Sequence, residues 1–501
     1  MIGSPLYEIF SKLSLSERKE LSKWVRSPIH NPSQDVVRLF DYLDKRAKIN
    51  EQSLISTARA EATTREKAFA YIFWQNVAYD ANKLRDIMSA LLGCIEQFLI
   101  YKELENNPIE KKIKLCRALR KRGLESRFEK TVSNTYKALE EQPHRNAQYH
   151  WQAAQILFEQ HEYEHQKDRT GPSPLKKASE ELNNYFISES LRQACFMLAH
   201  SNVSKYQYEQ PFLAPILAAI ASDLTAIASD NIEHPPSVLA HYYAYRVASD
   251  ATPDDIRIEN FEQLKNYLFD SSKSAYFSEW DLQQLYITAC NFCAKRQNGD
   301  DTTFTRHLFD LFQFGDDHDF LLENGSMQPS AFLYAVTAAL KIGELAWAEA
   351  FISKRQKQLL PDKAEIVTRI CQTALAFDSK DVQKAYKILG TLVLRNEDFY
   401  YNCHARVLRV CIEFELQKDY DVIDATLTNF SAYLYQHDEA GYARLNYQNF
   451  VRFAQQLNNL DPNDKTKTKH TALKMQIEET PQLARKKWLL EKINDLIVKK
   501  F

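Results

Sequence analysis

One pattern occurs three times between Ser330 and Tyr435, and it dictates the kind of fold that the chain adopts. Apolar residues fall at helical spacing before Gly343 and again after it, which predicts two helices joined by a turn. Two further pairs follow with turns near Lys380 and Lys418, so the turns are spaced by 37 and then 38 residues. Such spacing is typical of helical solenoids, in which each pair buries its apolar face against the next.

The composition extends this helical prediction to the whole chain. Only 10 of the 501 residues are glycine, whereas an average usage of about 7% gives more than three times that number. Strand-rich folds need glycine-bearing turns at short intervals, so the scarcity argues for long helices. A capping-box pattern at Ser14–Glu17 marks the start of one of them. We therefore predict an all-α fold.

Breaks in the helical pattern predict four segments. The clearest breaks are Asp168–Pro174 and Asp230–Pro236, which are rich in proline and polar residues. We expect an N-terminal helical bundle at 1–105, helical hairpins at 106–229, a solenoid at 230–460 and a C-terminal capping helix at 461–501. The last of these is expected as one helix over 481–500, because the terminal unit of an array needs a covering element.

The overall charge and the cysteine pattern predict the compartment. A net charge of −2 gives no field that attracts nucleic acid or an anionic membrane. No stretch reaches the roughly 18 consecutive apolar residues of a membrane span, and the N-terminus lacks the pattern of a secretory signal. The 8 cysteines are scattered through apolar helical patterns, as reduced and buried cysteines are. These features predict a cytoplasmic protein with no membrane insertion.

From about 237 to 458 the pattern resembles tetratricopeptide (TPR) repeats. In Ser330–Leu359 the small and large positions of that family map onto Phe332, Gly343, Ala348 and Ile352, with Pro361 near the closing proline. The second and third pairs depart from the family. Lysines 380 and 418 stand where its turn glycine belongs, and the period exceeds its roughly 34 residues.

The resemblance implies a scaffold whose concave face binds a segment of another protein. In TPR-like folds the first helix of each pair lines that face. By this analogy Tyr286, Arg296, Thr337 and Lys341 are expected to face the groove. The partner is expected to be a protein or a peptide, held without a cofactor.

One short string matches a catalytic motif. His161-Glu-Tyr-Glu-His165 has the H-E-x-x-H spacing, which places two imidazoles on one side of a helix to hold zinc, with Glu162 as general base. Charged neighbours such as Glu159 and Lys167 are atypical of zinc peptidases, and no third ligand stands at a compelling spacing. We favour a partly buried helix side over a metal site, and keep a zinc hydrolase as the alternative.

Two other patterns have a simple structural interpretation. Cys290 and Cys293 form a C-x-x-C string, but no second pair follows to complete a zinc site and no βαβ setting supports a redox motif. A basic run at Lys111–Arg122 offers phosphate contacts, yet no aromatic residues alternate with it for base stacking. We interpret these as core thiols and as a solvated helix side, and nucleic acid is not the expected partner.

The leading hypothesis is thus a non-catalytic interaction scaffold. The chain contains no P-loop, no G-x-G-x-x-G and no G-x-S-x-G sequence. Two alternatives stay open, namely a zinc metallohydrolase that uses His161, Glu162 and His165, and a nucleic-acid-associated regulator that uses Lys111–Arg122.

Overall fold

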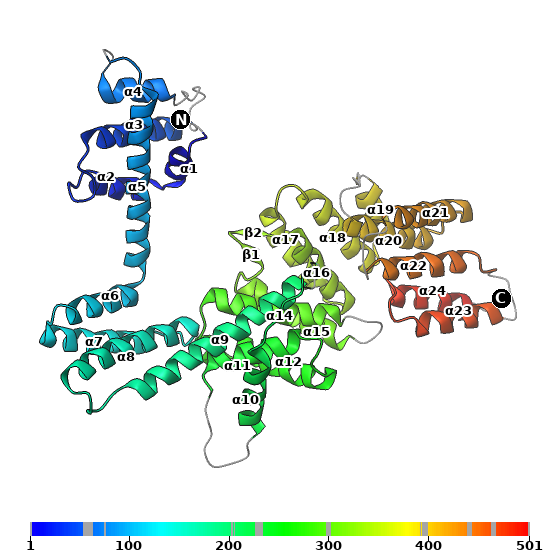
Figure 1. Cartoon of the computed structure of the whole chain (residues 1–501). Coiled ribbons are helices and arrows are strands. Elements are labelled where there is room, and N and C mark those ends of the chain that lie inside the picture. Colours follow the sequence, from blue (N-terminus) through cyan, green and yellow to red (C-terminus); the bar gives the residue numbers. More distant parts are fainter. Residues whose placement is uncertain are drawn as a thin grey trace. The chain divides into compact units, whose positions relative to one another are not determined.

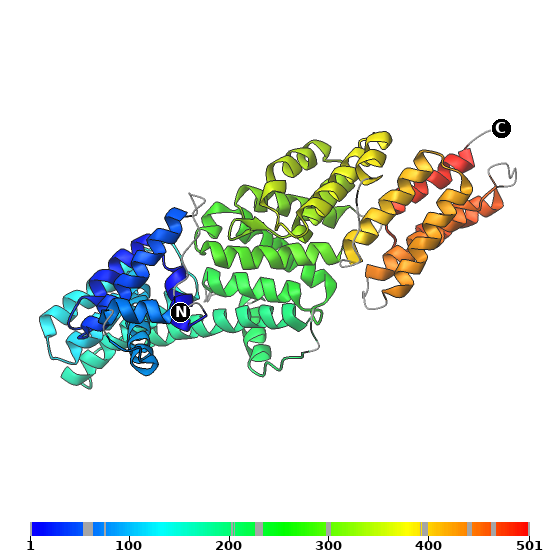
Figure 2. The ribbon, with the colours of Figure 1, turned by 90° about the horizontal axis from the view of Figure 1, so that it is seen from above.

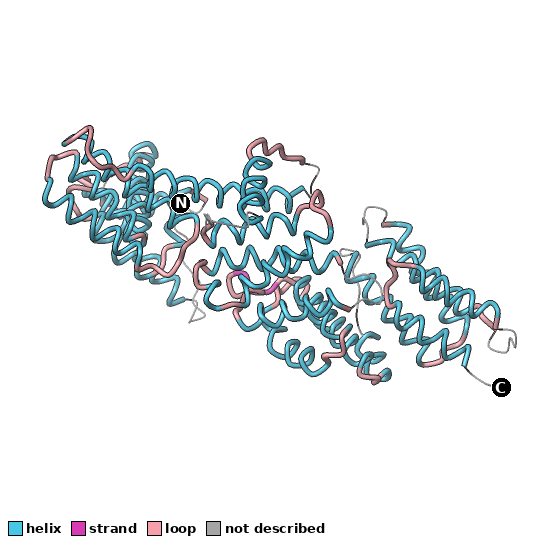
Figure 3. Tube along the Cα trace, turned by 90° about the horizontal axis from the view of Figure 1, so that it is seen from below, coloured by secondary structure: helices cyan, strands magenta, loops and turns pink. Residues whose placement is uncertain are grey.

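The computed structural model describes residues 3–53, 64–74, 77–201, 204, 206–225, 234–296, 302–390, 392, 399–437, 443–461 and 467–498. Within these residues the chain is almost entirely helical, and its only strands form one short hairpin (Figure 3). The all-α prediction is confirmed. The chain divides into two compact units, of which unit 1 contains 1–142 and 151–181 and unit 2 contains 143–150 and 182–501.

Unit 1 begins with a bundle around the long helix α5 (Ala81–Asn106), which contacts the four helices before it (Figure 1). These are α1 (Pro5–Lys12), α2 (Leu15–Val25), α3 (Gln34–Ser53) and α4 (Arg65–Phe73). Their apolar sides share one core. The capping box is present as expected, since the Ser14 hydroxyl accepts from the Glu17 N–H and the Glu17 carboxylate accepts from the Ser14 N–H.

The rest of unit 1 is built from α6 (Pro108–Arg120), α7 (Glu125–Glu140) and most of α8 (Ala147–Lys167). Helices α6 and α7 pair as a hairpin whose turn contains Gly123 at a positive φ of 65°. Helix α9 (Leu175–Ser201), like α8, contributes residues to both units.

Unit 2 is a succession of helix pairs, seen from above in Figure 2. Its elements are α10 (Leu213–Thr225), α11 (Pro236–Ala248), α12 (Asp254–Phe269), α13 (Ser271–Ser274), α14 (Glu279–Lys295), α15 (Thr303–Asp317), β1 (Leu322–Glu323), β2 (Ser326–Met327), α16 (Pro329–Lys341), α17 (Leu345–Arg355), the 3-10 turn η1 (Gln356–Gln358), α18 (Ala364–Asp378), α19 (Val382–Gly390), α20 (Phe399–Glu415), α21 (Tyr420–Gln436), α22 (Ala443–Asn458), α23 (Thr468–Glu479) and α24 (Lys486–Val498). Helices α18 and α20 contribute side chains to both large cores of this unit and so connect them.

The three helix pairs expected after Ser330 are present as α16–α17, α18–α19 and α20–α21. Each turn has one left-handed residue, at Gly343, Lys380 and Gln417, and these are 37 residues apart in both steps. The residue after each of them donates its N–H to a carbonyl five positions back, at distances of 2.9, 2.9 and 3.1 Å. This is the Schellman ending of a helix. The third turn therefore centres on Gln417, one residue before the expected lysine.

The residue type at these turns has a measurable effect on stability. Lys380→Gly is expected to raise the free energy of unfolding by about 0.5–1 kcal/mol, because lysine at a positive φ is strained and glycine is not. Gly343→Ala is expected to lower it by about 1 kcal/mol through the backbone alone, since no atom lies within 4 Å of an added Cβ. Urea unfolding followed by circular dichroism measures both changes. Lys384→Gly inside α19 is the matched control, and a loss of stability at Lys380→Gly equal to that of the control contradicts the expectation.

A β-hairpin precedes the first pair and was not expected. Asn324 and Gly325 both have positive φ angles, 52° and 77°, as a tight two-residue hairpin turn requires. The strand residue Met327 also bridges to Leu359, and its carbonyl accepts from the N–H of Leu360. The hairpin therefore ties the entry of α16 to the exit of α17.

The C-terminal segment differs from the single helix expected at 461–501. Two helices are present, α23 and α24, and they pack against each other and against α22. Helix α23 buries only His470, Leu473 and Ile477, which is too sparse a pattern to be recognised from sequence. Helix α24 contacts the end of α20, where Trp488 and Lys492 both donate to the Glu415 carboxylate at 2.8 Å. The expected boundary between 229 and 230 lies outside the described residues.

Candidate protein-interaction surface

Helix α16 is buried on most of its circumference and exposed along one line. Pro329 starts the helix at a position where its missing N–H costs little, and Phe332, Ala335 and Ala339 then bury the inner side. The exposed line consists of Tyr334, which is 51% exposed, half-buried Thr337 and exposed Lys341. These three residues are spaced by three and four positions and therefore lie on one side of the helix. Two of the four groove residues expected from sequence thus lie on this exposed line.

Tyr286 does not face a groove. Its side chain is only 3% exposed in the core of unit 2, and its hydroxyl is buried beside the Cys290 thiol of the same helix. The ring lies over Gly315 of α15, where the absence of a side chain leaves room for it. Burial raises the pKa of the Tyr286 phenol well above its ordinary value. The expectation that Tyr286 contacts a partner is therefore corrected to a packing role.

Arg296 also serves the interior of unit 2. It ends α14, its guanidinium lies 3.8 Å from the centre of the Phe292 ring, and it forms an ion pair with Asp254 at the start of α12. Its side chain is 15% exposed. Arg296 therefore fastens α14 to α12 and presents little surface to a partner.

The exposed side of α14 is instead marked by Trp280 and Ile287. Their exposed fractions are 47% and 42%, and they are seven residues apart on one side of the helix. Leu285, Ala289 and Cys293 are buried. Alanine and cysteine side chains favour the interior, so Ala289, Cys290 and Cys293 indicate which side of α14 faces the core. The sequence therefore did contain the signal for the register of this helix.

A hollow of about 280 Å³ opens between α19, α20 and α21. It is lined by Leu389, Leu392, Ala405, Arg406, Arg409, Thr426 and Asn429. Arg406 and Arg409 come from α20, and the two uncharged polar side chains come from α21. The hollow is thus cationic, and most of its lining comes from α20 and α21, the third helix pair.

The H-E-x-x-H string lies at the end of α8 and its groups are engaged by neighbours. The rings of His161 and His165 are 5.5 Å apart, and the His161 Nδ1 is 2.9 Å from the hydroxyl of Ser173. Glu162, the expected general base, is 3.6 Å from Arg120. In the described parts of the chain no group of three metal-ligating side chains includes these histidines. Two imidazoles alone are one short of the three protein ligands of a catalytic zinc centre.

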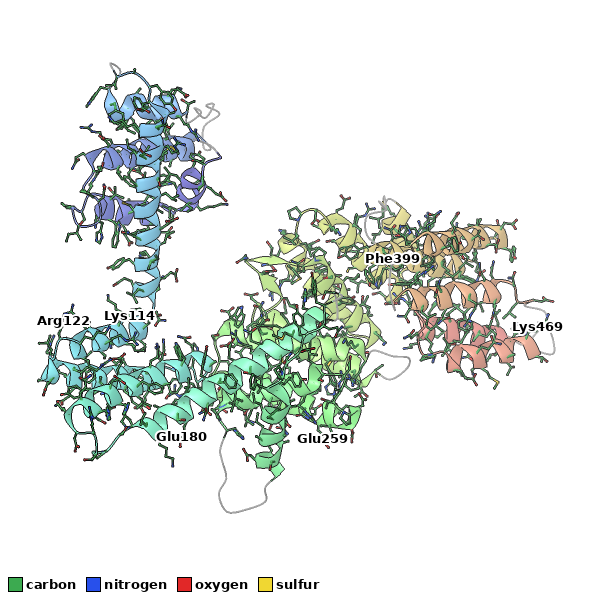
Figure 4. The ribbon with its side chains drawn as sticks, viewed as in Figure 1. Lys114, Arg122, Glu180, Glu259, Phe399 and Lys469 are labelled. Carbon is green, nitrogen blue, oxygen red and sulfur yellow. The ribbon has the colours of Figure 1, made fainter. Side chains whose placement is uncertain are left out.

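The carboxylate beside this string pairs with the basic run. Glu159 of α8 is 4% exposed, and its two oxygens accept from Arg117 at 2.5 Å and from Arg120 at 2.9 Å. Lys111 pairs with Glu105, and Lys114 pairs with Glu110. Figure 4 labels Lys114 on α6 and Arg122 just beyond the end of that helix. Acidic partners therefore compensate much of the run, which favours a structural role for it over phosphate binding.

The C-x-x-C thiols are held as neutral groups. Cys293 is fully buried in the core of unit 2, and Cys290 is partly buried. Burial raises the pKa of Cys290 to about 12 and raises the pKa of Cys293 as well. Because the thiolate is the form that attacks or binds metal, these cysteines fit the core role expected for them.

Comparisons of the chain with protein-family models, with curated proteins and with solved structures gave no significant match. No helix in the described residues combines the length and the apolar character needed to cross a bilayer.

Proposed function

We propose that this chain is a non-catalytic scaffold in which residues 237–458 form a TPR-like superhelix and hold a segment of a partner protein. The observation that supports this proposal most directly is the recurrence of one turn geometry at Gly343, Lys380 and Gln417, which gives successive helix pairs the same connection. Stacked pairs of this kind present the exposed positions of neighbouring helices as an extended surface. The free cysteines, most of them buried, support a reducing cytoplasmic setting.

We place the binding surface on the exposed line of α16 and in the hollow beside α20. The exposed Tyr334 supplies a large rigid contact area, and Lys341, seven residues further along the same side of the helix, adds charge for orientation. The eight buried residues of α16 fix this helix in the core, so the exposed line has the same geometry before and after a partner binds. A surface formed in advance loses less conformational freedom on binding.

An affinity-purification experiment on the intact protein tests this placement. The variant is Tyr334→Ala/Lys341→Glu, and the matched control is Tyr386→Ala/Lys387→Glu on α19, where Tyr386 is 43% exposed and Lys387 is also exposed. We expect a partner identified with the wild type to bind the α16 variant at least tenfold more weakly, a cost of about 1.4 kcal/mol, because contact area and charge are both lost. The control is expected to bind within about twofold of the wild type.

Two results would count against the proposal. One is equal loss in both variants, which indicates a general change in stability or charge. The other is unchanged partner binding after the α16 substitution, which places the function elsewhere.

A further inference from the structure

Arg406 is the one charged group around the hollow that lacks a compensating charge in the described part of the chain. Its guanidinium stacks 4.5 Å from the centre of the Tyr433 ring, and its Nε is buried with no hydrogen-bond partner among the described residues. Burial lowers the pKa of Arg406, and no carboxylate contributes to that shift. The buried Nε has given up water without gaining an acceptor, and this costs free energy.

The second arginine of the hollow is already paired. The Nε of Arg409 lies 3.5 Å from a carboxylate oxygen of Glu413, one helical turn along α20. Glu413 is 6% exposed, and burial raises its pKa. The Arg409 side chain is nevertheless 58% exposed, so its guanidinium remains accessible at the mouth of the hollow.

Three features of the hollow suit a single carboxylate. The unpaired Arg406 supplies the charge, and an arginine fork matches a carboxylate in a two-point contact. Asn429 supplies an uncharged donor from the facing helix α21, whereas the Thr426 hydroxyl is engaged by the Glu413 carboxylate. The volume of about 280 Å³ lies just below the roughly 300–1,000 Å³ of small-molecule sites, so it fits one side chain of a peptide better than a cofactor.

We propose that this hollow binds a carboxylate side chain of a peptide segment, with Arg406 as the residue that receives it. The inference rests on the proposed scaffold function and names the chemistry of the partner, an acidic segment. Arg409 and Asn429 orient the carboxylate, and the Tyr433 ring holds the Arg406 guanidinium in place.

Fluorescence anisotropy with labelled heptapeptides tests the proposal on the intact protein. The probes are a blocked heptaglutamate, a blocked heptaglutamine, and a heptaglutamine with a free C-terminal carboxylate. We expect the wild type to bind the heptaglutamate at least tenfold more tightly than the blocked heptaglutamine. The free-ended heptaglutamine distinguishes a terminal carboxylate from a side-chain carboxylate. If it binds more tightly than the blocked heptaglutamate, the assignment to a side chain is overturned.

Two variants test the role of the residues. Arg406→Met removes the charge, and Asn429→Asp keeps Arg406 but places a carboxylate at the hollow to compete with the peptide. Both are expected to weaken heptaglutamate binding at least tenfold. Arg127→Met, on the exposed side of α7, removes the same net charge and is expected to leave binding within twofold. Wild-type affinity in either hollow variant would overturn the proposal.

The remaining candidate for the hollow is a carboxylate of the chain itself, and a stability measurement tests this alternative. Glu397 and Asp398 belong to a stretch outside the described residues. If Glu397→Gln/Asp398→Asn and Arg406→Met lower the unfolding midpoint by amounts that fail to add, the chain's own carboxylates neutralise Arg406 and the proposal is wrong. Loss of the partner in the α16 variant, together with unchanged peptide binding by Arg406→Met, would keep the scaffold function and remove only this inference.

Discussion

Asp316→Ala is expected to lower the free energy of unfolding of unit 2 by about 3 kcal/mol, because it removes the buried carboxylate that pairs with Arg355 and leaves only the largely exposed Asp319 to compensate that charge. The Arg355 side chain is 3% exposed, and its Nε donates to an Asp316 carboxylate oxygen at 2.5 Å. Its other nitrogens donate to the Asp316 carbonyl at 2.7 Å, to Asp319 at 2.7 Å and to Gln358 at 3.0 Å. The set fastens the end of α15 to the end of α17.

Asp316→Ala is costly because it leaves the buried Arg355 charge poorly compensated. The intact Asp316–Arg355 pair itself need not add much to the free energy of unfolding. The double variant Asp316→Leu/Arg355→Met removes both charges and fills the space, so it is expected to be markedly more stable than Asp316→Ala. Asp317→Ala, at the exposed neighbouring position, is the control and is expected to change stability by less than about 0.5 kcal/mol.

Chemical unfolding measures the total change, and amide hydrogen exchange locates it. Protection is expected to fall in α15 and α17 and to remain unchanged in α1 to α5 of the separate N-terminal core. A single variant no less stable than the double variant would show that Arg355 finds other compensation.

Gly315→Ala is expected to destabilise the protein by about 3 kcal/mol, whereas the same change at Gly93 is expected to stabilise it. A Cβ on Gly315 would lie 2.3 Å from the Tyr286 hydroxyl oxygen and 2.6 Å from its Cζ. Tyr286 is only 3% exposed, so its ring can move aside only by displacing its buried neighbours. At Gly93, in α5, no atom lies within 4 Å of an added Cβ, and alanine gains up to about 1 kcal/mol of helix propensity.

A double variant identifies the clash as the cause. Tyr286→Leu removes the atoms that an alanine at 315 would meet, so Gly315→Ala should cost less in the Tyr286→Leu background than in the wild type. Urea unfolding of the four proteins gives the coupling free energy. Additive costs would mean that Gly315 is needed for another reason, such as the bending of α15.

The helices and their turns were largely readable from sequence because their signals are local. The apolar spacing and the scarcity of glycine predicted an all-α chain, and the three pairs after Ser330 are present. The hydrogen bonds of the Ser14 cap join residues three apart, so the sequence alone specifies them. Helix α23, with three buried residues in a mostly polar segment, gave too weak a pattern.

The sequence by itself therefore determined which segments are helical, with the exception of α23, and where most of them end, since both depend on neighbours a few residues away. The tertiary structure decided which side of most helices is exposed, although the small and thiol residues of α14 already indicated its register. The TPR resemblance treated Tyr286 and Lys341 as equivalent, yet one is buried over Gly315 and the other lies at the surface. The pairing of Glu159 with Arg117 and of Asp316 with Arg355 joins residues 42 and 39 positions apart. Such pairs form only when whole helices pack, and no local signal in the chain encodes them.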